Sequence, residues 1–100
     1  MIRAEFIEKG LTIRTKSQYM YDKGVQMQIV NAPEGSWYID FGNGITEQPI
    51  NDAVMIPDSL FLSGNDVEAY IVCLGNNGAV NTITKIIIPV NWRPARGEEV

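Results

Sequence analysis

The chain has 100 residues, of which 45% are hydrophobic and 20% are charged, and its formal net charge is −4. This length suits one domain that folds without disulfides or metals, and the composition argues against disorder. The absence of histidine removes the usual general base and the commonest metal ligand, and the single cysteine excludes an internal disulfide and a cysteine-ligated zinc site. No apolar run approaches the ~20 residues of a membrane span, and the first residues do not resemble a signal peptide.

The charges are distributed unevenly along the chain. Residues 1–23 carry five basic and three acidic side chains, residues 24–84 carry seven acidic and no basic ones, and residues 85–100 carry three basic and two acidic ones. Two interpretations stay open: the strand order averages these charges over the surface, or an acidic body with basic ends docks on an acidic assembly or head-to-tail. The net negative charge argues against nucleic acid as the main partner.

Alternation of apolar and polar residues predicts the first β-strands. The pattern covers residues 2–6, 25–29 and 37–41, each with one apolar and one polar face. Turn residues recur about every ten positions between these segments, which is typical of an all-β sandwich or barrel. No helical stretch long enough for a βαβ unit separates the predicted strands.

Two longer strands are predicted in the second half of the chain. Residues 67–74 are apolar on both faces after Glu68, which predicts a central strand. Residues 80–90 form a β-branched run, the strongest strand signal in the sequence. The sequence Gly-Asn-Asn-Gly at residues 75–78 lies between them and predicts a β-hairpin, because Asn and Gly tolerate the positive φ of hairpin turns.

The only helical candidate is the segment from Pro57 to Gly64. Pro57 can open a helical turn and Gly64 can close it, and the eight residues allow two turns at most. We expect a short crossover that closes one end of the fold with Leu60, Phe61 or Leu62.

Together these elements predict an all-β, immunoglobulin-like antiparallel β-sandwich over residues 1–90 with one short helical crossover. The remaining residues, 91–100, have no periodicity, and Pro89 and Pro94 favour an extended path away from the sheet. This segment is either a frayed terminus or a docking arm. Trp92 favours the docking arm, because a large aromatic side chain gains energy at an interface and none in a disordered end.

No constellation of catalytic residues is present, so we expect a protein that is not an enzyme and holds no cofactor. Cys73 lies in an apolar strand without basic neighbours in the sequence and is interpreted as a buried structural cysteine. Four oxygen-bearing residues surround a Gly-rich turn, but their spacing differs from that of a calcium-binding loop, so we interpret them as solvated turn residues. They are Asp40, Asn43, Glu47 and Asp52.

The aromatic residues allow a sugar-binding hypothesis. Exposed Trp and Tyr side chains on a β-sandwich can stack on sugar rings. Trp37, however, alternates with Ile39 and Phe41 as a core residue would, whereas Tyr38 lies on the opposite face and is the better surface candidate.

Four segments, in order, resemble small structural proteins of tailed bacteriophages. The segment Gln18–Val25 is similar to a "TQYD-x-G" pattern, and Val54–Gly64 is similar to "x-IPD-x-LL-x-SG". Val67–Val72 resembles the strand "I-x-AYI-x-V", and Ile86–Pro94 resembles the closing "I-x-IPV-x-x-RP". Together they cover most of the chain, and their specificity comes from their order.

The resemblance implies a β-sandwich attached to the virion as an accessory capsid, head-fibre or tail component. The chain departs from the pattern in two ways. Its last part, from Arg93 to Arg96, contains less proline than is common in that family, and the chain ends at Val100 without a fibrous segment. It therefore resembles a free-standing accessory protein or a shortened form of a longer one.

From the resemblance we expect a non-enzymatic virion protein, made in the host cytoplasm, that decorates the phage head by binding the major capsid protein or other virion proteins. Trp92 would fill an apolar pocket of the neighbour, and the arginines would pair with carboxylates there. The expected contact residues are Trp92, Arg93, Pro94 and Arg96, followed by Arg14 and Lys16 near the N-terminus.

Other assignments stay open. A tail or baseplate adaptor would share the fold and differ only in its partner, and a carbohydrate-binding module would attach the particle to host glycans. The long last strand could also support a homo-oligomer through its edge. Neither nucleic acid nor membrane is an expected partner.

Overall fold

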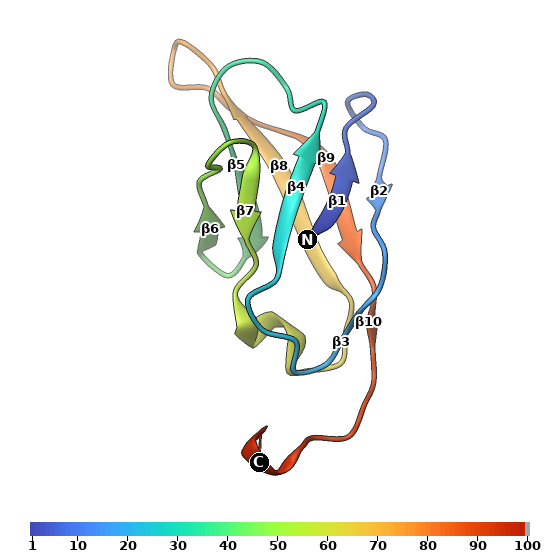
Figure 1. Cartoon of the computed structure of the whole chain (residues 1–100). Helices are drawn as coiled ribbons and strands as arrows, with labels where there is room; N and C mark the ends of the chain where they lie inside the picture. Colours follow the sequence, from blue (N-terminus) through green and yellow to red (C-terminus); the bar gives the residue numbers. More distant parts are fainter. Residues whose placement is uncertain (100) are drawn as a thin grey trace.

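Ten β-strands and two 3₁₀ turns make up the computed structural model, which describes residues 1–99 (Figure 1). In chain order the strands are β1 (Ile2–Glu5), β2 (Ile13–Arg14), β3 (Gln18–Tyr19), β4 (Gln26–Val30), β5 (Trp37–Gly42), β6 (Ile45–Glu47), β7 (Ala53–Met55), β8 (Val67–Leu74), β9 (Val80–Ile88) and β10 (Val90–Asn91). The 3₁₀ turns are η1 (Asp58–Phe61) and η2 (Gly97–Glu99).

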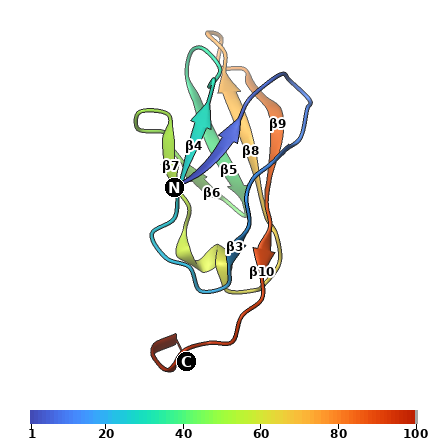
Figure 2. The ribbon, with the colours of Figure 1, turned by 45° about the vertical axis from the view of Figure 1, so that its right-hand side comes forward.

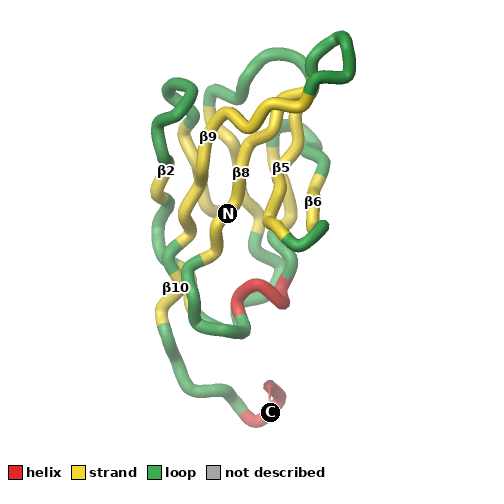
Figure 3. Tube along the Cα trace, turned by 180° about the vertical axis from the view of Figure 1, so that it is seen from behind, coloured by secondary structure: helices red, strands yellow, loops and turns green. Residues whose placement is uncertain are grey.

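The strands form two facing sheets and a small third one (Figures 1 and 2). The larger sheet has the order β2-β9-β8-β5-β6 and is seen from its outer side in Figure 3. The sheet that covers it has the order β1-β4-β7, and the pair β10-β3 lies near the end where the C-terminal segment leaves. The fold is therefore all-β, as the sequence predicts.

The sheets are mixed, which corrects the expectation of an antiparallel sandwich. β1 pairs in parallel with β4, β2 with β9, and β3 with β10, whereas the other ladders are antiparallel. The chain crosses from one sheet to the other between β1 and β2 and then runs beside β9 in the same direction (Figure 1). β2 and β3 have two residues each, too few to show the alternation that marks a strand in a sequence.

The longer predicted strands are confirmed within one or two residues. In β1, β4 and β5 the apolar residues of the alternating pattern are buried and the polar ones are more exposed. β8 is the middle strand of the five-stranded sheet, as its two apolar faces indicate. The run predicted at residues 80–90 is divided at Pro89, which has no N–H to donate to a ladder.

The predicted β8–β9 hairpin is also confirmed. The N–H of Gly75 donates to the carbonyl of Ala79 over 2.8 Å, and the N–H of Gly78 donates to the carbonyl of Gly75 over 3.2 Å. The side chain of Asn77 accepts a further bond from the N–H of Ala79 over 3.1 Å. The hairpin extends beyond the other strands at the end of the molecule opposite the C-terminus (Figure 1).

The core fills the space between the two larger sheets and is closed at one end by η1. Phe61 is 0% exposed, whereas its neighbour Leu62 is 53% exposed. Of the three apolar residues expected to close this end, Phe61 is the one that is fully buried. The fully buried side chains of the core include Met27, Ile29, Ile39, Ile56, Phe61, Ile71, Ile86 and Ile88.

Candidate functional site

The segment that follows β10 leaves the sheets and then turns back in a hook (Figures 1 and 3). Trp92 lies at the start of this segment and is 72% exposed, which is unusual for the largest apolar side chain. The 3₁₀ turn η2 forms the end of the hook. The sequence predicts an extended arm over residues 91–100; the structure adds the hook, and residue 100 lies outside the described residues.

A bidentate ion pair closes the hook. Nη1 and Nη2 of Arg93 donate to Oε1 and Oε2 of Glu99 over 2.7 and 2.6 Å. Nη1 also donates to the carbonyl of Pro94 over 3.0 Å, and the backbone N–H of Arg96 donates to Oε1 of Glu99 over 2.8 Å. The side chains of Arg93 and Glu99 are only 16% and 7% exposed, so the pair is shielded from solvent.

The ion pair changes the protonation of both partners. The hydrogen bonds from Arg93, together with the backbone N–H of Arg96, hold the pKa of Glu99 at about 2. The same contact raises the pKa of Arg93, so both groups are charged at neutral pH. The hook is thus held by two opposite full charges.

Tyr21 connects the hook to the body of the fold. The guanidinium carbon of Arg93 lies 4.9 Å from the centre of the Tyr21 ring, a cation–π distance. The backbone N–H of Tyr21 donates to the carbonyl of Phe61 over 3.4 Å, which ties the backbone at Tyr21 to η1. Tyr21 has a φ of 69°, a left-handed conformation that is rare for a bulky residue and that costs about 1 kcal/mol or more. This strained backbone places the ring beneath Arg93.

The predicted contact residues fall into two separate groups. Trp92, Pro94 and Arg96 are exposed on the hook, and their docking role stays a prediction. Arg93 was expected to pair with a partner's carboxylates; in this structure it pairs with Glu99 of its own chain. The sequence offers only a weak signal for this pair, because Pro94 and Gly97 allow the chain reversal but do not specify it.

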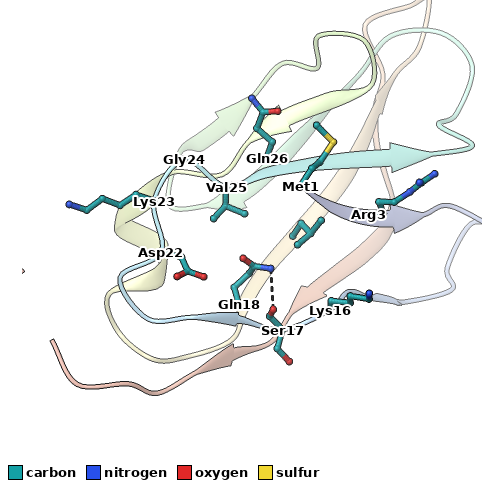
Figure 4. A pocket seen from close by; sticks show the side chains of 11 residues that line it. Met1, Arg3, Lys16, Ser17, Gln18, Asp22, Lys23, Gly24, Val25 and Gln26 are labelled. Atoms are coloured by element: carbon teal, nitrogen blue, oxygen red, sulfur yellow. Dashed lines mark hydrogen bonds between the residues drawn. The ribbon is translucent and has the colours of Figure 1, made fainter. Parts of the chain in front are cut away.

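The other two predicted contact residues, Arg14 and Lys16, lie on a different part of the surface. Both are exposed, on β2 and just after it. Lys16 lines an open groove of about 640 Å³ between the start of β1 and β3 (Figure 4). Arg14 lines an adjacent depression of about 320 Å³, and Arg3 of β1 lines both. The sequence did not identify Arg3 as a contact residue. The only feature that marks Arg3 in the sequence is that it is one of the polar, outward-facing residues in the alternating pattern of β1.

The exposed aromatic residues differ from those expected. Trp37 is buried, as predicted, but Tyr38 is half-buried, because β5 lies inside the five-stranded sheet with β8 and β6 on either side. The aromatic side chain exposed on a strand is instead that of Tyr19 on β3. Tyr19 pairs with Asn91 on β10, and Trp92 is the next residue after Asn91. One exposed aromatic residue therefore lies on β3, and the other lies just after the neighbouring strand β10.

The remaining candidate groups of the sequence are Cys73 and the oxygen-bearing residues around the β5–β6 turn. Cys73 is half-buried rather than buried, and burial raises the pKa of its thiol, so the thiol is protonated at neutral pH. Oδ1 of Asp40 accepts from the N–H of Gly42 over 2.7 Å and thereby stabilises the β5–β6 turn. Within residues 1–99, no group of three or more Cys, Asp or Glu side chains is placed to hold a metal ion.

Among the described residues, no helix has the length and apolar character to cross a membrane. Comparison of the chain with protein families, with curated proteins and with solved structures finds no match.

Proposed function

We propose that the chain is a non-enzymatic structural protein of a phage virion, which binds the particle surface through its C-terminal hook. The proposal rests on the resemblance of four segments to phage structural proteins and on one structural observation. That observation is Trp92, an exposed tryptophan on a segment that an ion pair and a cation–π contact hold in place. An anchor side chain on a braced segment loses little conformational entropy when it binds.

We further infer that the fold is an immunoglobulin-like sandwich. The strand order supports this: β4 and β7 share one sheet, whereas β5, β8 and β9 share the other. Immunoglobulin-like domains place their second and fifth strands in one sheet and their third, sixth and seventh strands in the other. Such a body offers a rigid support for docking segments at its ends.

Replacement of Trp92 tests the proposed function. We expect Trp92→Ala to bind the particle at least about tenfold more weakly, because buried interface tryptophans commonly contribute 2 kcal/mol or more. Ile50→Ala is the matched control, since Ile50 is also a highly exposed apolar residue but belongs to the β6–β7 connection. Quantitative mass spectrometry of purified particles measures the copies bound, and circular dichroism checks the fold of both variants.

Two outcomes would contradict the proposal. One is equal occupancy of particles by Trp92→Ala and the wild-type chain. The other is the absence of the wild-type chain from every assembled particle of the phage that encodes it.

A carbohydrate-binding module is the second candidate, favoured by two exposed aromatic residues, Tyr19 on β3 and Trp92 just after β10. Both side chains are exposed, and the strands β3 and β10, to which these residues belong or are adjacent, pair with each other. Aromatic rings can stack on sugar faces. A glycan array and a titration followed by tryptophan fluorescence test this candidate; silence on the array with unchanged fluorescence removes it.

A further inference from the structure

The outer face of the five-stranded sheet carries apolar residues that do not belong to the core. Tyr38 of β5 points away from the core, because it alternates with the buried Trp37 and Ile39. Val72 of β8 pairs with Tyr38, and residues paired across an antiparallel ladder lie on the same face of a sheet. Val72 is only 3% exposed, yet it is not a member of the buried cluster between the sheets. The outer face thus has an apolar cluster of its own.

An apolar strip runs along β8 from this cluster toward the hairpin. Leu74 follows Val72 on the same face and pairs with Val80, and the side chains of Leu74 and Val80 are 42% and 58% exposed. Tyr70 precedes Val72 on this face and is half-buried. Figure 3 looks onto the face, and residues 1–99 place no further layer of structure over it. A contiguous apolar strip on an open sheet face indicates a contact surface.

The charges beside the strip have opposite signs on its two sides. Tyr70 pairs with Lys85 of β9 on one side and with Asp40 of β5 on the other, so both charged residues lie on the outer face. Arg14 of β2 pairs with Ile87 of β9 and is exposed on the basic side. The face is therefore basic toward β2 and acidic toward β6, with β8 in the middle.

A two-fold axis parallel to β8 makes this face complementary to itself. A half-turn about such an axis places the β9 side of one copy over the β5 side of the other, at the same height along the strands. Lys85 of each copy then faces Asp40 of the other copy, and Leu74 faces its own counterpart. Two-fold dimers require such a self-complementary surface, because both chains contribute the same patch.

We propose that two copies of the chain form a two-fold dimer through this face, with the two β8 strands at its centre. The strands of the two sheets run in nearly the same direction, as in the aligned packing of β-sheets. Five strands about 4.8 Å apart and the eight residues of β8, at about 3.3 Å each, give a face of about 600 Å² per copy. A total of about 1,200 Å² lies at the lower limit of stable interfaces, so the dimer exchanges with the monomer. The proposal goes beyond the role of the hook and does not depend on it.

A second copy fits this face better than a different protein of one predominant charge. An acidic or a basic partner would meet its own sign on one side of the strip. The charged residue of β8 itself, Glu68, has its Oε1 3.0 Å from Nζ of Lys85, which balances the charge of Glu68 close to the axis. Oδ1 of Asp40 accepts from the N–H of Gly42, which leaves Oδ2 to accept from Lys85 of the other copy.

Sedimentation of the purified chain tests the dimer. We expect the weight-average mass to rise from that of the monomer toward twice that value between about 10 µM and about 1 mM, because an interface of this size is weak. Over the same range the amide signals of Tyr70, Val72 and Leu74 should shift in nuclear magnetic resonance spectra, and those of β1 and β4 should stay constant. A monomer mass at every concentration, or shifts in β1 and β4 instead, would overturn the proposal.

Two matched variants locate the contact. Leu74 lies on the proposed axis, so an aspartate there faces its own counterpart, and we expect Leu74→Asp to weaken dimerisation at least about tenfold. Ile50 is 77% exposed and belongs to the β6–β7 connection, outside this face. Ile50→Asp should therefore change dimerisation less than about twofold. Equal weakening by the two variants would refute the assignment of the contact to β8.

Exchanged charges test the two-fold arrangement itself. The side chain introduced by Lys85→Glu faces Asp40 of the other copy, and the one introduced by Asp40→Lys faces Lys85. Each variant alone should dimerise at least about tenfold more weakly than the wild-type chain. An equimolar mixture of the two should dimerise again, because both contacts then join opposite charges. A mixture that associates no better than its components would contradict the proposed axis.

Two further measurements complete the test. Circular dichroism checks the fold, since Asp40→Lys removes the acceptor of the Gly42 N–H. If that variant does not fold, Lys85→Glu and Leu74→Asp carry the test. Trp92→Ala should leave dimerisation unchanged, which distinguishes this proposal from the role of the hook. Loss of the dimer in Trp92→Ala would place self-association at the hook and overturn the proposal.

Discussion

Oδ1 of Asp66 accepts a hydrogen bond from the backbone N–H of Val90 over 3.0 Å. Asp66 precedes β8, and Val90 follows Pro89, the residue that interrupts the last long strand. A side chain therefore holds the chain at the point where it passes from β9 to β10. This contact holds β10 in place together with its ladder to β3, and the hook begins directly after β10.

Replacement of Asp66 should loosen this junction. Asp66→Ala leaves the partly buried N–H of Val90 without its acceptor, and we expect the free energy of unfolding to fall by about 1 kcal/mol. Asp66→Asn keeps an oxygen in the same place and should lose less. Urea unfolding of the three proteins measures the difference; an Ala variant as stable as the wild-type chain would show that the bond contributes nothing.

Phe61 should be the most sensitive residue of the η1 segment. It is fully buried, so Phe61→Ala leaves a cavity in the core, and we expect a loss of about 3–5 kcal/mol in the free energy of unfolding. Leu62→Ala is the control, because Leu62 is largely exposed, and its effect should stay within about 0.5 kcal/mol. Thermal and chemical unfolding measure both, and a similar loss in the two variants would contradict the assignment of Phe61 to the core.

Gly64 should tolerate a side chain less well than Gly10. Both have a positive φ, 77° and 84°, so an alanine at either position costs about 1–2 kcal/mol in backbone strain. At Gly64 the added Cβ would also lie 3.1 Å from Sδ of the buried Met20, whereas at Gly10 it meets nothing within 4 Å. Gly64→Ala should therefore lower the melting temperature more than Gly10→Ala, and the reverse order would contradict this argument.

The hook should open in acid. The pKa of Glu99 is lowered from 4.5 to about 2, so the contribution of its carboxylate to stability is present above pH 4.5 and is lost as the pH falls toward 2. Nuclear magnetic resonance of the Glu99 and Arg93 side chains across this range measures the titration. Glu99→Gln should give an open hook at every pH, and Glu98→Gln serves as the control on the neighbouring residue. Titration of Glu99 near its ordinary value would contradict the bidentate pair.

The sequence predicts the elements in which burial repeats with a regular period. β1, β4 and β5 show alternation over four or more residues, and β8, the middle strand of its sheet, is apolar on both faces after Glu68. Strands of two or three residues, such as β2 and β6, carry too few positions for any period to appear. The parallel pairs depend on contacts between distant segments, which local patterns do not report.

The candidate site was predicted only in part, for a related reason. Trp92 is notable in the sequence because it interrupts a polar segment. The Arg93–Glu99 pair depends on a turn at residues 96–99, and the contact with Tyr21 depends on a left-handed backbone far away in the chain. The basic groove brings Arg3 and Lys16 together only after β1 and β2 have entered different sheets. None of these relationships has a local sequence signature.

The parallel ladders between residues 13–19 and 86–91 have a consequence for synthesis. Within residues 1–99, β2 pairs only with β9, and β3 pairs only with β10. A nascent chain that has left the ribosome as far as residue 80 therefore carries both early strands without partners, and β8 with one open edge. The domain completes its fold only when its last strands have emerged, so the early strands are exposed to aggregation for most of translation.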